Sequence, residues 1–154
     1  MADIKNAYGT KTTITITGTS LANGSAREST VIDNTTNKFT DARVRVALNG
    51  QTSGSAQVDF YVYSALGDTG YTDGATGSDA AFTAANRLNA RYVGSIQMNV
   101  TTAVKGELPS IAAAFGGVMP DKWGLIMVNN SGAALSATAG DTVIEFEGIY
   151  QTVT

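Results

Sequence analysis

Two carboxylates stand two residues apart near the end of the chain, at Glu145 and Glu147. Glycosidases use paired carboxylates as acid and base, so this pair is the clearest catalytic candidate in the sequence. Catalytic carboxylates normally come from different elements that converge in a cleft, whereas these two share one face of an expected strand. We therefore expect cross-strand ion pairs with an outward arginine, such as Arg43, Arg45 or Arg91.

The sequence lacks the residues that most other catalytic and metal-binding sites require. The sequence contains no cysteine and no histidine, which excludes thiolate zinc sites, cysteine nucleophiles, histidine metal ligands and the Ser-His-Asp triad. Asp68, Asp73 and Asp79 lie in a glycine-rich stretch that could hold Ca²⁺, but their spacing fits no calcium motif, which favours a solvated loop. No glycine-rich phosphate-binding loop is present. We therefore expect a protein that is not an enzyme and has no cofactor or metal.

Charge and hydropathy limit the partners. Ten Lys and Arg stand against 13 Asp and Glu, for a net charge of −3, which argues against binding to nucleic acid. The longest apolar runs are far too short to cross a bilayer, so no membrane is expected as a partner. The first ten residues lack the apolar stretch of a signal peptide, which predicts synthesis in the cytoplasm.

The elements that must position these residues are strands. A length of 154 residues fits one domain, and alternating apolar and polar residues recur in Phe39–Leu48, Ala56–Leu66 and Asp141–Val153. Leu88–Val100 alternates too, with Tyr92 expected inward, and Trp123–Val128 is apolar on both faces, as in a central strand. We predict an all-β, single-domain antiparallel β-sandwich or jelly roll of about seven or eight strands.

The N-terminus differs from the rest of the chain. Residues 1–10 show no periodicity and are interpreted as an extended arm, while residues 11–154 form the β-sandwich domain. Such an arm is either disordered or adds to the sheet edge of a neighbouring molecule. Its candidate contact residues are Ala2, Ile4 and Tyr8.

Tyrosines on the second face of a strand also require a partner. Tyr61 and Tyr63 share the face of Ala56–Leu66 opposite its core residues, and tyrosine is enriched in protein contacts and sugar-binding platforms. They are either buried under the stretch Gly67–Ala85 or contact a partner. That stretch is expected to be a surface loop with a helical turn near Asp79–Ala85. It adds Tyr71 and Asp73 as candidate contact residues.

Several segments together carry a family resemblance. They are ADIKNAYGT, RESTVIDNTTNKFTDARVRV, FYVYSALGDTGYTDGATGSDAAFT, FGGVMPDKWGLIMVNNSGAAL and FEGIYQTV. With them the chain resembles the decoration, or cement, proteins of tailed-bacteriophage heads. The resemblance implies a non-enzymatic virion protein of β-sandwich or jelly-roll type on the capsid surface, often a homotrimer, which clamps neighbouring major capsid proteins. It implies no catalytic residues.

A second function remains open for the same fold. A carbohydrate-binding or receptor-binding module of a phage particle would stack exposed aromatics, chiefly Tyr61, Tyr63, Tyr71 or Trp123, on sugar rings. A structural protein of the phage neck or tail would have the same composition and sequence pattern. Trp123 lies in a segment that is apolar on both faces, which favours a place in the core.

Overall fold

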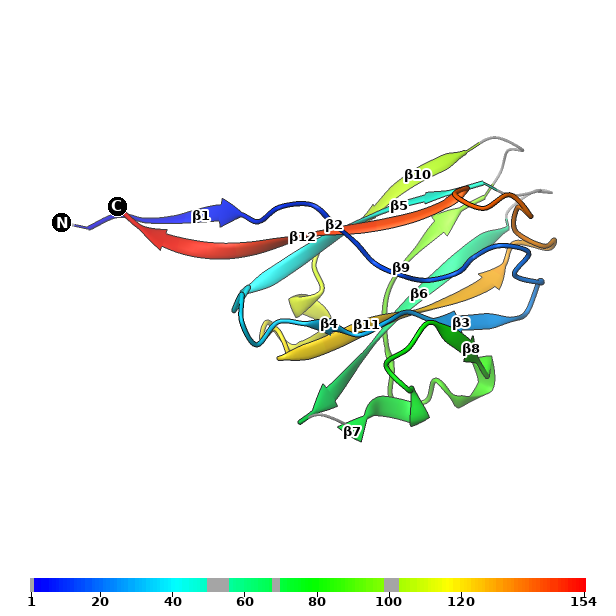
Figure 1. The fold of residues 1–154 in the computed structure, drawn as a ribbon, viewed down its shortest axis with the longest axis horizontal. Coiled ribbons are helices and arrows are strands. Elements are labelled where there is room, and N and C mark those ends of the chain that lie inside the picture. The colour runs from blue at the N-terminus through cyan, green and yellow to red at the C-terminus, as the bar shows by residue number, and fades with distance from the viewer. Residues whose placement is uncertain (1, 50–55, 68–69, 99–102) are drawn as a thin grey trace.

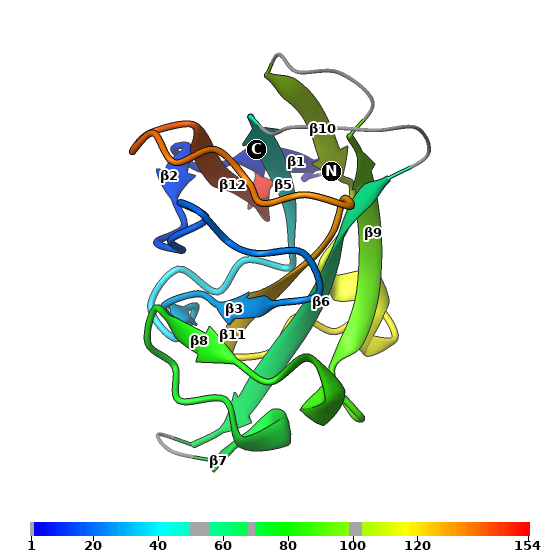
Figure 2. The ribbon, with the colours of Figure 1, turned by 90° about the vertical axis from the view of Figure 1, so that its right-hand side faces the viewer.

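The computed structural model describes residues 2–49, 56–67, 70–98 and 103–154. Within them the chain forms strands and short 3₁₀ turns, with no α-helix, and the strands build two antiparallel sheets packed as a sandwich. The predicted all-β fold of a single-domain β-sandwich is confirmed. Figures 1 and 2 show the two layers from two sides.

The first sheet carries both chain termini. Its strand order is β1-β12-β5-β10, and a further short strand, β2, pairs with β12. The strands are β1 (Ile4–Tyr8), β2 (Thr12–Thr13), β5 (Asp41–Leu48), β10 (Val104–Leu108) and β12 (Thr142–Val153).

The second sheet is built around β11. Its strand order is β7-β6-β11-β3-β8, while β4 pairs with β11 and β9 pairs with β6. The strands are β3 (Ala26–Glu28), β4 (Ile32–Asp33), β6 (Gln57–Leu66), β7 (Gly70–Tyr71), β8 (Ala80–Phe82), β9 (Arg91–Gln97) and β11 (Lys122–Asn130). Across the described residues of both sheets, seven strands have five or more residues and five have only two or three. The number of long strands agrees with the expected seven or eight, although they include β1, which was expected as an extended arm. A strand of two or three residues is too short for alternation to be recognised.

Alternating side chains fill the space between the sheets. On β5, the inward residues Ala42, Val44, Val46 and Leu48 are all fully buried, as expected. On β11, Trp123, Leu125 and Met127 belong to this main core, while Ile126 and Val128 belong to a second buried cluster. This strand is apolar on both faces because both faces are covered, so its prediction as a central strand is confirmed.

The second cluster lies beneath residues 70–90, which we call the covering segment. It contains β7, the 3₁₀ turn η1 (Thr72–Gly74), β8 and the 3₁₀ turn η2 (Ala84–Asn86). A third 3₁₀ turn, η3 (Ala112–Phe115), precedes β11. The helical turn expected near Asp79–Ala85 is wrong at its start, because Ala80–Phe82 pairs with β3 as an edge strand. Figure 2 shows β8 beside β3.

The facing of Tyr92 differs from the alternation expected for β9. It points outward with 54% of its surface exposed, whereas Ile96 on the same strand is buried as expected. The register between β6 and β9 shifts, since Phe60 pairs with Gly94 but Tyr61 pairs with Tyr92. The extra residue of this β-bulge reverses the facing of the residues before it.

Candidate binding surface

The two ends of the chain form a ribbon that projects from the sandwich. β1 pairs with the last residues of β12 from Tyr8 opposite Ile149 to Ile4 opposite Val153, and Asp3 and Thr154 exchange two backbone hydrogen bonds of 3.0 Å. β5 pairs with β12 only as far as Ile149, so the ribbon extends beyond it. Figure 1 shows both termini at the tip. We call residues 3–8 and 149–154 the terminal ribbon.

The expected extended arm is therefore present as β1, paired with the chain's own β12. The arm was expected to be either disordered or paired with a neighbouring molecule, and the structure shows neither. Its side chains make few contacts, because Ile4, Lys5, Asn6 and Tyr8 are all exposed. Ala2, ahead of the strand, is exposed too.

The outer face of the ribbon carries apolar side chains at its tip and at its base, with Asn6 and Gln151 between them. Residues directly opposite each other in an antiparallel pair share a face, which places Ile4 beside Val153 and Tyr8 beside Ile149. The exposed fractions are 67% for Ile4, 71% for Val153 and 56% for Tyr8. Single exposed apolar residues are common on protein surfaces, but adjacent ones on a projecting element indicate a contact surface.

A charged ladder continues this face toward the body. Arg43 lies opposite Glu147 and Arg45 opposite Glu145, and both pairs form salt bridges. The guanidinium carbon of Arg43 also lies 5.3 Å from the ring centre of Tyr8, a cation–π contact that holds the ring against the sheet. The ladder therefore fixes the base of the ribbon.

These pairs are the ion pairs that one of the two interpretations of the glutamates predicts. Hydrogen bonds from Lys11 and Arg45 hold the pKa of Glu145 below its ordinary value, and the hydrogen bond to Glu147 raises the pKa of Arg43. A general acid needs a raised pKa, so Glu145 is unsuited to that role. The expected cross-strand ion pairs are confirmed for Arg43 and Arg45, whereas Arg91 lies over the ring of Phe115.

A groove of about 700 Å³ lies at the foot of the ribbon, between the first sheet and β4. Its half-buried side chains include Ile32, Phe39 and Tyr150. The rings of Phe39 and Tyr150 are 6.2 Å apart, and a Cβ on Gly148 would come within 2.3 Å of Phe39. The aromatic wall of the groove is thus closely packed against the sheet that carries the ribbon.

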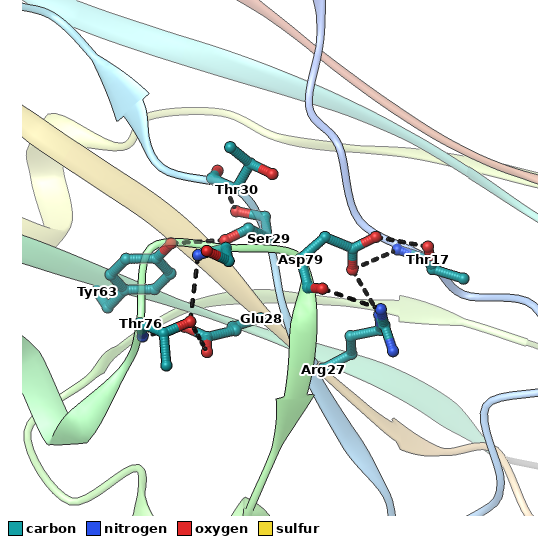
Figure 3. A network of polar contacts seen from close by, with 9 residues as sticks. Thr17, Arg27, Glu28, Ser29, Thr30, Tyr63, Thr76 and Asp79 are labelled. Atoms are coloured by element: carbon teal, nitrogen blue, oxygen red, sulfur yellow. Dashed lines mark hydrogen bonds and ion pairs between the residues drawn. The ribbon is translucent and has the colours of Figure 1, made fainter.

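Two carboxylates anchor the covering segment (Figure 3). Asp79 accepts hydrogen bonds from the backbone and hydroxyl of Thr17 and from the guanidinium of Arg27. Glu28, which is fully buried, accepts two bonds of 2.8 Å from the backbone N–H and hydroxyl of Thr76. The segment is consequently bonded to both the second sheet and the chain before β3.

This arrangement corrects one predicted contact residue and explains another. Tyr63 is fully buried beneath the covering segment and donates a 2.7 Å hydrogen bond to the carbonyl of Ser29, so no partner can reach it. Burial raises the pKa of its hydroxyl far above the ordinary value. Tyr71 is half-buried, with its ring edge-on to that of Tyr63 at 6.0 Å. Burial under the loop, one of the two expectations for this strand face, is confirmed for Tyr63.

Asp73 joins the covering segment to the turn before β9. Its carboxylate accepts the backbone N–H groups of Asn89 and Ala90 at 2.7 and 2.6 Å. Burial raises the pKa of Asp73, but a hydrogen bond from the side chain of Asn89, together with these two backbone bonds, outweighs it and holds the pKa below its ordinary value. Asp68 lies outside the described residues, and the remaining chain holds no cluster of three metal-ligating side chains.

A smaller aromatic surface lies on the second sheet. Tyr61 is half-buried, its ring centre is 5.5 Å from that of Tyr92, and Arg87 lies 5.0 Å above it. Tyr92 was missed because alternation predicted it inward. Gly94 was the available signal, since an isolated glycine in a strand often marks a bulge. Trp123 is only 1% exposed and offers no platform.

The missed residues of the ribbon are Ile149 and Val153. Both lie in Asp141–Val153, which was expected as a strand, but nothing in their local pattern shows that β1 pairs beside them.

No protein-family model matches the chain, and no curated protein matches it. Among the described residues, no helix is long and apolar enough to span a membrane.

Proposed function

We propose that this chain is a non-enzymatic structural protein of a tailed-phage particle, which binds neighbouring major capsid proteins on the outside of the head. The observation that carries the proposal is the terminal ribbon, which projects from the sandwich and exposes Ile4 and Val153 side by side at its tip. The sequence resemblance to decoration proteins is the reason for proposing major capsid proteins as the partner. The homotrimer that it implies remains part of the proposal.

The proposed protein would act by joining neighbouring capsid subunits to each other. A protein that binds the assembled shell more tightly than the isolated capsid subunits stabilises the shell by mass action. Several weak contacts from one oligomer add through effective concentration, so each ribbon needs only modest affinity. An exposed apolar tip of a few side chains fits a modest contact of this kind.

Mixing the pure protein with undecorated heads tests the proposal. We expect it to bind them, to appear at fixed positions in cryo-electron micrographs, and to raise their resistance to heat. The double variant Ile4→Asp, Val153→Asp should lose binding, because it places charge on the apolar tip. Leu88→Asp is the matched control, since Leu88 is 84% exposed but lies outside the ribbon. Absence of binding by the unaltered protein would refute the proposal.

The adjacent rings of half-buried Tyr61 and exposed Tyr92 favour a second candidate, a carbohydrate-binding or receptor-binding module. Edge-on aromatic rings beside an arginine offer both stacking surface and hydrogen-bond donors to a sugar. A glycan array separates the two functions. Binding that Tyr92→Ala abolishes would favour this candidate, and an empty array would remove it.

A further inference from the structure

The terminal ribbon leaves one edge of β12 open. Asp3 and Thr154 form a hydrogen-bonded pair, so the alternate residues Gln151 and Val153 turn their N–H and C=O groups to the other edge of β12. At Ile149 this edge still accepts a 2.7 Å hydrogen bond from Thr40. Beyond Ile149, no strand of the described chain pairs with it.

This edge lacks the features that protect other edges of the molecule. Proteins keep exposed strand edges from pairing by charges, bulges and short strands. Lys105 and Glu107 occupy the edge strand β10, β9 has its bulge at Gly94, and the outer strand of the ribbon, β1, carries Lys5. Residues 150–154, Tyr-Gln-Thr-Val-Thr, contain no charge, proline or glycine. The free edge of β12 is therefore suited to accept another strand.

We infer that the occupant of this edge is the same segment of a second copy of the chain, paired antiparallel across a two-fold axis at Thr152. In this register Gln151 of each copy lies opposite Val153 of the other. Both residues point N–H and C=O groups to the shared edge, so the two pairs form about four hydrogen bonds without displacing any bond of the single chain.

The charge pattern of the segment supports a second copy over an unrelated strand. Self-pairing places identical side chains near the axis, so charged residues there would repel, and residues 149–154 contain none. A two-fold axis perpendicular to the sheet keeps the outer faces of both ribbons on one side. On that side the row of Ile4 and Val153 in one copy continues into Gln151 and Asn6 of the other.

Proline substitutions test this pairing. Val153→Pro removes an N–H group that points to the open edge, so the single ribbon keeps its own bonds. Asn6→Pro is the matched control, because the N–H of Asn6 points to the opposite edge, outside β1. In sedimentation equilibrium of the pure protein we expect copies to pair two by two in a reversible step, from monomer to dimer or, where the proposed homotrimer forms, from trimer to hexamer. Val153→Pro should weaken it roughly tenfold to a hundredfold, since each copy loses one donor, and Asn6→Pro should leave it unchanged.

A disulfide trap locates the two-fold axis. The chain has no cysteine, so Thr152→Cys introduces a single thiol at a position where two strands at a non-hydrogen-bonded site approach within disulfide range. We expect rapid covalent dimers for Thr152→Cys under mild oxidation and slow ones for Asn6→Cys.

The inference does not depend on the capsid proposal, because these measurements use the pure protein. It is refuted if the unaltered protein stays monomeric at high concentration, or if Val153→Pro dimerises as the unaltered protein does. Monomeric protein whose binding to heads is lost in Val153→Pro would assign the edge to a capsid-protein strand and also refute it. Dimers that fail to bind heads would leave the pairing intact and refute only the capsid function.

Discussion

At the residue scale, Gly124 is fixed by the ring that covers it. It lies opposite Tyr63 in the ladder of β11 and β6, and a Cβ at this position would come within 2.4 Å of the tyrosine ring. We predict that Gly124→Ala lowers the free energy of unfolding by about 1–3 kcal/mol, because Tyr63 has no space to move. Urea denaturation measures this. In the background Tyr63→Ala the cost should largely disappear, and equal costs in both backgrounds would contradict the explanation.

Asp79 makes the anchoring of the covering segment depend on pH. Burial raises its pKa, but hydrogen bonds from Arg27 and Thr17 outweigh this and hold the pKa below the ordinary value of 3.8. Its contribution to stability is therefore complete above the ordinary pKa and is lost as the pH falls through the folded-state pKa. We predict that Asp79→Asn costs about 1–3 kcal/mol at neutral pH. The difference from the unaltered protein should shrink as the pH falls below about 4, and a constant difference in urea denaturation would contradict this.

At the scale of elements, the sequence predicts strands whose partners follow from burial. The alternation of β5 and the two apolar faces of β11 identify core strands correctly, because each residue's facing is a local property. The facing of Tyr92 fails, since the bulge at Gly94 depends on the pairing with β6. The strand β8 is too short to show a period.

The ribbon could not be predicted for a related reason. Its two strands are separated by almost the whole chain, and the polar pattern of β1 gives no indication of which strand it joins. Extended conformation is a local property and was expected, whereas the choice between the chain's own β12 and a neighbour depends on tertiary structure. Likewise, the position of Tyr63 beneath residues 70–90 follows from contacts between distant segments.

The independence of β1 from the core gives a prediction at this scale. Its side chains are nearly all exposed, and a two-stranded ribbon gains little stability of its own. We predict that deleting residues 2–8 changes the free energy of unfolding by less than about 1 kcal/mol while abolishing binding to heads. Amide protons of β1 should also exchange with solvent much faster than those of β11. A loss of several kcal/mol on deletion would show that β1 supports the sandwich.

At the scale of the whole molecule, the absence of cysteine and histidine limits how the protein can respond to pH and to redox conditions. A histidine is the side chain whose ordinary pKa falls near neutrality, and this chain has none. The carboxylates with shifted values, Asp33, Asp73, Asp79 and Glu145, all have a lowered pKa, so they stay ionised across the neutral range. None of these four carboxylates therefore changes charge between about pH 6 and 8.

We accordingly predict one cooperative unfolding transition whose midpoint stays constant from about pH 6 to 8 and does not respond to reductant. Cooperativity follows from shared elements, since β6 and β11 contribute residues to both buried clusters. Calorimetry of the free protein measures both features, and Asp79→Asn should lower the midpoint equally across this range. A midpoint that moves with pH near neutrality, or two separate transitions, would contradict the prediction.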